Sequence, residues 1–171
     1  MHYQPQRHLL KDRIILVTGA SDGIGREAAL TYARYSASVI LLGRNDDKLR
    51  TGAQEIEREG GIPPRWFTLD LLTCTPQACQ QLAQQISMHY PRLDGVLHNA
   101  GLLGDICPME EQKPEVWQQV MQVNVNGTFM LTQALLPLLL RSESGSLVFT
   151  SSSVGRQGRA NASAGQRLTG G

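Results

Sequence analysis

The stretch Ile14–Gly25, which reads IILVTGASDGIG, decides the fold that this sequence can adopt. Its first five residues are β-branched or apolar, a composition typical of a strand that is buried on both faces. Three glycines with the spacing G-x-x-x-G-x-G then break the strand, and a helical pattern begins at Arg26. A strand, a glycine turn and a helix in this order predict the first unit of a parallel α/β sheet.

The glycine turn predicts a site for the pyrophosphate of a nucleotide. Glycine has no Cβ, so the backbone can turn sharply and a ligand can approach it closely. The helix that follows presents free N–H groups and the positive end of its dipole, and both favour phosphate. A turn that serves packing alone is the alternative. The residues expected at this site are Gly19, Ser21, Gly23, Ile24 and Gly25.

The spacing of these glycines differs from that of two common phosphate-binding motifs. It is not the G-x-G-x-x-G dinucleotide fingerprint, and it is not a P-loop, because no Gly-Lys-Ser/Thr follows. The string T-G-x-x-x-G-I-G, residues 18–25, resembles the cofactor loop of the short-chain dehydrogenase/reductase family. The resemblance implies an oxidoreductase that uses NADP(H) or NAD(H) on a small carbonyl or alcohol. It also implies that an intact member forms a homo-oligomer.

Strand and helix patterns alternate along the rest of the chain. They predict an α/β fold, a Rossmann-like doubly wound parallel sheet with about five strands in the order 3-2-1-4-5 and no second domain. Family members carry further strands, so we expect this sheet to be incomplete, with an uncovered fifth strand. Ser36 ends the first helix where many relatives have glycine, which predicts strain at that helix end. The expected strands are residues 14–18, 39–42, 65–69, 95–98 and 146–150, and the expected helices are 26–35, 46–59, 75–90 and 114–140.

Composition and charge exclude several classes of function. Sixteen basic and fifteen acidic residues leave a net charge of +1, so we expect neither nucleic acid nor a membrane surface as a partner. The three cysteines have no metal-ligand spacing, and no metal site is expected. An odd cysteine count without a signal-peptide pattern favours a cytoplasmic protein. The most apolar run, residues 130–140, is too short to span a bilayer.

Charged residues after the second and third strands predict contacts with the adenosine half of a cofactor. Arg44 follows the second strand, where dinucleotide folds often place an acid for the ribose hydroxyls. An arginine there can pair with a 2′-phosphate, which favours NADP(H) over NAD(H). A solvated surface arginine is the alternative, and the nearby Asp46 and Asp47 count against NADP(H). By the resemblance, Asp70 is placed to reach the adenine edge, and otherwise it would cap the turn at residues 71–73.

The block His98–Gly101, HNAG, resembles the family's Asn-Asn-Ala-Gly signature at the end of the fourth strand. Small residues there let the adenosine half of a cofactor lie against the strand ends. His98 replaces the first asparagine, and we expect it to be structural, since no second metal ligand lies at a suitable spacing. The expected cofactor contacts in this block are Asn99, Ala100 and Gly101.

Two residues resemble members of the family's catalytic set. Asn124, in the run VNVNG, matches the helix asparagine that holds a water in the proton relay. Ser152, in the run TSSSVG, matches the serine that hydrogen-bonds the substrate oxygen. A serine hydrolase is not indicated, because the G-x-S-x-G elbow is missing from the sequence.

The family's catalytic tyrosine and lysine have no counterpart in this sequence. The resemblance places them thirteen and seventeen residues after Ser152, where this chain has Gly165 and Thr169. The last tyrosine is Tyr90 and the last lysine is Lys113. The resemblance ends near residue 161, and the change to a sequence rich in glycine and alanine predicts a truncated or frameshifted reading frame.

Two regions and three hypotheses follow. We expect residues 1–154 to form an NADP-binding Rossmann domain and residues 155–171 to be a non-native, disordered tail. The first hypothesis is that the chain descends from NADP(H)-dependent oxidoreductases of this family but is itself inactive, because the catalytic tyrosine and lysine are missing. The second hypothesis is a non-catalytic dinucleotide-binding half-fold, and the third is a defunct product that does not fold stably. Self-association through the uncovered strand is expected if the chain folds.

Overall fold

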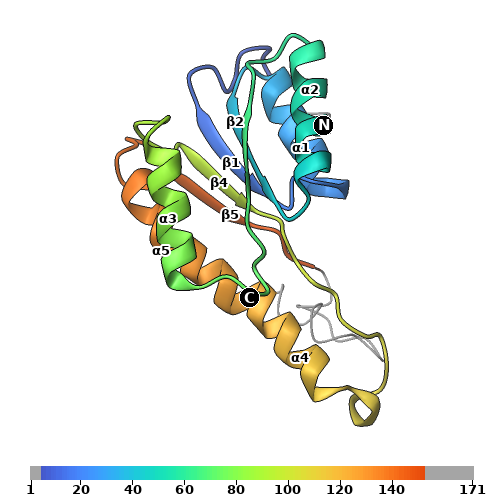
Figure 1. The fold of residues 1–171 in the computed structure, drawn as a ribbon. Helices are drawn as coiled ribbons and strands as arrows, with labels where there is room; N and C mark the ends of the chain where they lie inside the picture. The colour runs from blue at the N-terminus through green and yellow to red at the C-terminus, as the bar shows by residue number, and fades with distance from the viewer. Residues whose placement is uncertain (1–4, 153–171) are drawn as a thin grey trace.

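The computed structural model describes residues 5–152, which form one five-stranded parallel sheet (Figure 1). The strand order is β3-β2-β1-β4-β5, which confirms the predicted Rossmann-like fold. The strands are β1 Ile14–Thr18, β2 Ser38–Gly43, β3 Arg65–Thr68, β4 Gly95–His98 and β5 Ser146–Phe149. The helices are α1 Gly23–Arg34, α2 Asp46–Arg58, α3 Pro76–Ser87, α4 Pro114–Met121 and α5 Thr128–Leu139, with a 3₁₀ turn η1 Met109–Glu111 and a π-helical turn η2 Gln122–Gly127.

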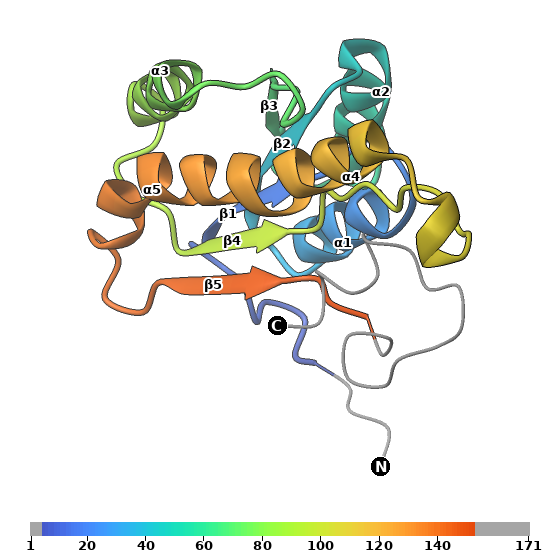
Figure 2. The ribbon, with the colours of Figure 1, turned by 90° about the horizontal axis from the view of Figure 1, so that it is seen from below.

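Helices cover both faces of the sheet and create two apolar layers (Figure 2). Successive residues of β2 enter opposite layers, Ile40 on the side of α3 and α5 and Leu41 on the side of α1 and α2. Leu135 of α5 packs in the first layer and Leu30 of α1 in the second. Because β1 and β2 lie between the two layers, their sequences are apolar over most of their length.

The first helix begins earlier than its apolar pattern indicated. α1 starts at Gly23 rather than at Arg26, because Asp22 is its N-cap and accepts a hydrogen bond from the Gly23 N–H at 2.9 Å. α3 begins at Pro76, one residue after the start of the expected range 75–90, because Thr75 is its N-cap and the Thr75 hydroxyl accepts a backbone N–H at 3.2 Å. The predicted helix 114–140 comprises α4, η2 and α5, with a π-helical turn in the middle.

The end of α1 has a strained backbone. Ser36 has a φ of +74°, in the left-handed region that favours glycine. Its N–H donates to the carbonyl of Ala33 at 2.9 Å, and its hydroxyl is hydrogen-bonded to Nδ1 of His8 at 2.8 Å. The predicted strain at this helix end is therefore confirmed, and two hydrogen bonds hold the conformation.

β5 is the last strand of the sheet, and its outer edge is unpaired within residues 5–152. Leu147, Val148 and Phe149 are 37%, 49% and 53% exposed, which confirms the uncovered fifth strand for this part of the chain. Over the same residues, no helix is both long enough and apolar enough to cross a membrane. The predicted tail, residues 155–171, lies outside the described residues.

Candidate functional site

A cleft of about 920 Å³ opens at the carboxyl ends of β1, β2 and β4. It lies at the switch point of the sheet, between β1 and β4, where open α/β sheets bind their ligands. Most of the residues predicted to bind a cofactor line this cleft, so the fold brings four separate segments of the sequence together. These residues are Gly19, Ser21, Gly23, Arg44, Asp70, Asn99, Ala100 and Gly101.

Two other predicted cofactor residues, Ile24 and Gly25, are not among those that line the cleft. Ile24 lies in the first turn of α1 and is 71% exposed. A Cβ on Gly25 would overlap the carbonyl oxygen of Gly19 and lie 2.7 Å from Nδ2 of Asn99. Gly25 therefore lets α1 pack closely against the turn and supports the shape of the cleft from behind.

The glycines of the cleft allow backbone segments to approach one another. Gly19 has a φ of +66°, and a Cβ on it would lie 3.0 Å from the backbone of Ala100. At the end of β2, a Cβ on Gly43 would overlap the hydroxyl of Ser21. Sequence reasoning missed Gly43, for which the signal was a lone glycine at the end of an apolar strand.

Thr18 joins the ends of β1 and β4. It is 2% exposed, and its hydroxyl accepts hydrogen bonds from the N–H groups of Asn99 and Ala100, both at 3.0 Å. These bonds hold the turn after β4 against the turn after β1. Sequence reasoning missed this role, because a threonine at a strand end carries no signal of its distant partner.

Among residues 5–152, two cations and two acids line the cleft, namely Arg44, Lys48, Asp22 and Asp70. Nζ of Lys48 lies 2.5 Å from Oδ2 of Asp22, and this hydrogen bond holds the pKa of the Asp22 carboxyl below its usual value. Asp70 accepts a hydrogen bond from the N–H of Leu72 at 3.0 Å. It therefore caps the turn after β3, which is the structural alternative given for this residue above. Sequence reasoning missed Asp22 and Lys48.

Asp46 and Asp47, the two acids that counted against NADP(H), are bonded to residues outside the cleft. Asp46 accepts a hydrogen bond from Nε1 of Trp66 at 3.0 Å, and Asp47 lies 2.6 Å from the guanidinium of Arg50. Neither acid lines the cleft, whereas Arg44 does. Within residues 5–152, Arg44 forms no ion pair, so it brings an unpaired positive charge to this end of the cleft.

The two predicted catalytic residues, Asn124 and Ser152, are not part of the cleft lining. Oδ1 of Asn124 accepts from the N–H of Leu102 at 2.7 Å, and its Nδ2 donates to the carbonyl of Leu102 at 3.0 Å. These bonds fasten the segment after β4 to η2. Ser152 is half-buried and follows β5. Gly165 and Thr169, where the tyrosine and lysine were expected, lie outside the described residues.

His98 connects β4, β5 and α5. It is 4% exposed and stacks on Phe149, with ring centroids 4.9 Å apart and planes 10° from parallel. Nε2 lies 3.0 Å from the hydroxyl of Thr132, and Nδ1 has no hydrogen-bond partner among the described residues. Burial lowers the pKa of His98 to about 4, so the ring is neutral at pH 7. Within the same residues, no group of three or more His, Cys, Asp or Glu side chains is arranged to hold a metal ion.

Comparison with known proteins identifies relatives of this chain. The sequence pattern of the short chain dehydrogenase family matches residues 13–164. An oxidoreductase of Escherichia coli K12 named YciK is 78% identical over 161 residues, which cover 94% of this chain and 64% of the relative. The chain therefore spans somewhat less than two thirds of the length of that relative.

Solved structures of relatives share the fold. The structure of YciK from E. coli has a TM-score of 0.96 at 74% identity, and the match covers 99% of this chain and 69% of the other. A short chain dehydrogenase from E. coli CFT073, complexed with NADPH, has a TM-score of 0.94 at 74% identity, with coverage of 96% and 69%. The family match and these relatives show that this chain belongs to the short chain dehydrogenase family of oxidoreductases.

Proposed function

We propose that this chain binds NADP(H) in the cleft, as part of an oxidoreductase that moves hydride between the nicotinamide and a small carbonyl or alcohol. The observation that carries the proposal is Arg44, which lines the cleft at the end of β2, where an acid would repel a 2′-phosphate. The relative from E. coli CFT073 was solved with NADPH. NAD(H) is the weaker alternative, because it has no phosphate for Arg44.

The residues of the cleft fit a dinucleotide. Gly19 and Gly23 both have positive φ, and a Cβ on Gly23 would meet no atom within 4 Å. The start of α1 is therefore open to an anion, which its N–H groups and dipole favour. Ile24 and Gly25 remain predicted contacts that follow directly in α1. We assign Gly19, Ser21 and Gly23 to the pyrophosphate, Arg44 to the 2′-phosphate, and Asp70, Asn99, Ala100 and Gly101 to the adenosine half.

The chain of 171 residues is expected to bind cofactor without useful hydride transfer. The bound cofactor would supply or accept the hydride. By family resemblance, Ser152 would hydrogen-bond the substrate oxygen and Asn124 would hold a relay water, but a tyrosine supported by a lysine moves the proton. The sequence has no tyrosine after Tyr90 and no lysine after Lys113. A positioned general acid contributes about 10²–10⁴ in rate, and a serine hydroxyl is too weak an acid to replace it.

Cofactor binding is tested by titrating the chain with NADPH and NADH and following the fluorescence of the reduced nicotinamide. We expect NADPH to bind more tightly, and Arg44→Ala to remove most of the preference while NADH affinity stays unchanged. A charge-assisted bond to a phosphate contributes about 1.5–3 kcal/mol, which is about 10- to 150-fold in affinity. Arg50→Ala is the control, since Arg50 does not line the cleft. Equal affinity of the unaltered chain for both cofactors would contradict the role of Arg44.

Hydride transfer is tested separately. NADPH oxidation is measured with ketones, aldehydes and quinones, both for the chain and for a version with Gly165→Tyr, Thr169→Lys and the C-terminal segment of a relative. We expect turnover only in the rebuilt version. Comparable turnover by the unaltered chain would show that another residue moves the proton.

We further propose that the chain is cytoplasmic and that it can associate with a second copy of itself. We assign residues 1–154 to the NADP-binding domain. Cys74, Cys79 and Cys107 are free thiols, which suits the reducing cytoplasm. The exposed apolar edge of β5 is the surface that would pair with a second copy of this chain. Nucleic acid and membrane surfaces are not proposed as partners, because the net charge is only +1.

A further inference from the structure

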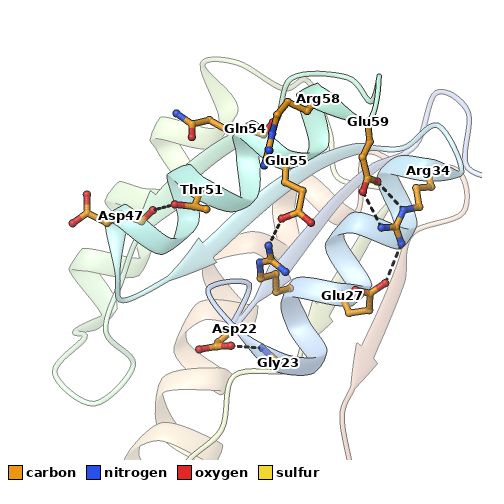
Figure 3. Close-up of polar contacts among 11 residues, drawn as sticks. Asp22, Gly23, Glu27, Arg34, Asp47, Thr51, Gln54, Glu55, Arg58 and Glu59 are labelled. Atoms are coloured by element: carbon orange, nitrogen blue, oxygen red, sulfur yellow. Dashed lines mark hydrogen bonds and ion pairs between the residues drawn. The ribbon is translucent and has the colours of Figure 1, made fainter.

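The ion pair between Asp22 and Lys48 joins two helices at the cleft. Asp22 is the N-cap of α1, and its Oδ1 accepts a hydrogen bond from the N–H of Gly23 (Figure 3). Its second oxygen, Oδ2, lies 2.5 Å from Nζ of Lys48, which belongs to the first turn of α2. Both residues line the cleft. One carboxylate therefore caps a helix with one oxygen and holds a lysine with the other.

Lys48 is held in place by the turn that carries Arg44. Asn45 is the N-cap of α2, and its side-chain oxygen accepts a hydrogen bond from the N–H of Lys48 at 2.9 Å. The backbone of Lys48 is thus fixed in the first turn of α2, four residues after Arg44. Its side chain is 54% exposed, and a flexible four-carbon stem carries the ammonium. The ammonium can therefore leave Asp22 for an anion beside Arg44 without a change in the backbone.

Among the described acids that line the cleft, Asp22 is paired with Lys48, whereas Asp70 accepts a hydrogen bond from the N–H of Leu72. Asp46 and Asp47 are bonded to Trp66 and Arg50 and do not line the cleft. A phosphate monoester carries a charge between about −1.5 and −2 at neutral pH and has three acceptor oxygens. It attracts an ammonium more strongly than a single carboxylate does, so a bound 2′-phosphate would win the competition.

We propose that Lys48 is a second determinant of NADP(H) selectivity, which exchanges Asp22 for the 2′-phosphate when the cofactor binds. The inference rests on the proposed function, because it requires a dinucleotide in the cleft. In the free chain Lys48 neutralises Asp22, and in the complex it joins Arg44 at the phosphate. NAD(H) has a hydroxyl at that position and leaves the pair of Asp22 and Lys48 intact.

The alternative to this proposal is that the ion pair of Asp22 and Lys48 only stabilises the fold. α1 and α2 are also joined by Arg34 and Glu59, whose closest atoms are 2.8 Å apart (Figure 3). The pair of Asp22 and Lys48 could be one more link between these helices, but it lines the cleft and the other pair does not. A structural link would change stability and leave the ratio of NADPH to NADH affinity unchanged. A binding experiment therefore separates the two explanations.

The experiment measures dissociation constants by titration calorimetry on the full chain. The ligands are NADPH and NADH, together with 2′,5′-ADP and 5′-AMP, a pair that differs only in the 2′-phosphate. The variants are Lys48→Gln, Asp22→Asn and the two combined, and asparagine caps a helix as well as aspartate does. Lys48→Arg keeps the charge. Arg50→Gln is the matched control, since it removes a cation from the same helix outside the cleft.

We expect Lys48→Gln to weaken NADPH and 2′,5′-ADP binding about tenfold, because it removes a cation from a doubly charged phosphate. NADH and 5′-AMP affinities should not change. Asp22→Asn should strengthen NADPH binding, since it releases Lys48 and removes a repelling charge. In that background Lys48→Gln should cost more affinity than in the unaltered chain. Lys48→Arg and Arg50→Gln should keep the preference for NADPH.

Each contrary result has a distinct meaning. An unchanged ratio of NADPH to NADH affinity in Lys48→Gln would overturn the proposal in favour of a structural pair. An effect of Lys48→Gln that vanishes in the Asp22→Asn background would overturn the exchange, since Lys48 would then only neutralise Asp22. If the unaltered chain binds neither NADPH nor 2′,5′-ADP, the proposed function and this inference both fail. A preference that depends on Arg44 but not on Lys48 refutes this inference alone. Circular dichroism confirms that each variant is folded.

Discussion

Protonation of His98 should destabilise the folded chain below neutral pH. The ring is 4% exposed, and its Nδ1 has no partner among the described residues. Burial lowers the pKa of His98 from 6.5 to about 4. The folded state therefore keeps the ring neutral, while the unfolded chain binds a proton near pH 6.5. Because the folded pKa is the lower one, the stability is fully present above pH 6.5 and is lost as the pH falls from 6.5 toward 4.

The size of the effect follows from the two pKa values. One pKa unit corresponds to about 1.4 kcal/mol, so the whole shift is worth about 3 kcal/mol. At pH 5 the unfolded histidine is almost fully protonated and the folded one is almost neutral. The free energy of unfolding should therefore be about 2 kcal/mol lower at pH 5 than at pH 7.5 on account of His98 alone.

The assay is urea unfolding followed by circular dichroism at pH 7.5 and pH 5.0, for the unaltered chain and for His98→Asn. Asparagine does not titrate, and it is the residue that the family signature has at this position. The variant loses the stack on Phe149 and should be less stable at pH 7.5. The difference between the two proteins should shrink by about 2 kcal/mol at pH 5.0, because all other titrating groups cancel.

A difference in unfolding free energy that is the same at both pH values would refute the reasoning. It would mean that His98 can take up a proton in the folded state without cost, so that the ring is less isolated from water than its burial indicates. If His98→Asn does not fold, His98→Gln provides the same comparison with a longer side chain.

Three further predictions concern stability and association. Thr18→Val keeps the side-chain shape but leaves the N–H groups of Asn99 and Ala100 without their acceptor. The free energy of unfolding, measured in urea, should fall by about 2 kcal/mol, and an unchanged value would contradict the role of Thr18. Ser36→Gly relieves a left-handed conformation and should raise the unfolding free energy by about 1 kcal/mol; a loss would mean that the hydrogen bond to His8 outweighs the strain. Val148→Lys places a charge on the open strand β5 and should abolish self-association in sedimentation velocity, whereas an unaltered chain that stays monomeric at high concentration would rule out pairing through this edge.

The fold could be read from the sequence because its signals are local. β1 and β2 lie between two layers of helices, so each appears as an apolar run that ends in turn residues. The start of the helix expected at 75–90 was also local, since Thr75 caps α3 and Pro76 is its first residue. The start of α1 was placed too late because Gly23 and Ile24 show no helical periodicity, and the cap at Asp22 sets the boundary instead.

The sequence located the segments that line the cleft but not the contacts between their side chains. The glycine turn, Arg44 and the segment 99–101 were located because each follows a strand, and the carboxyl ends of parallel strands meet at one edge of the sheet. Tertiary structure decided which side chains meet there. Lys48 reaches Asp22 across 26 residues of sequence, and Asp46 turns to Trp66 instead of the cleft. Such contacts depend on the distance and angle between packed elements, and neither periodicity nor spacing along a chain contains that information.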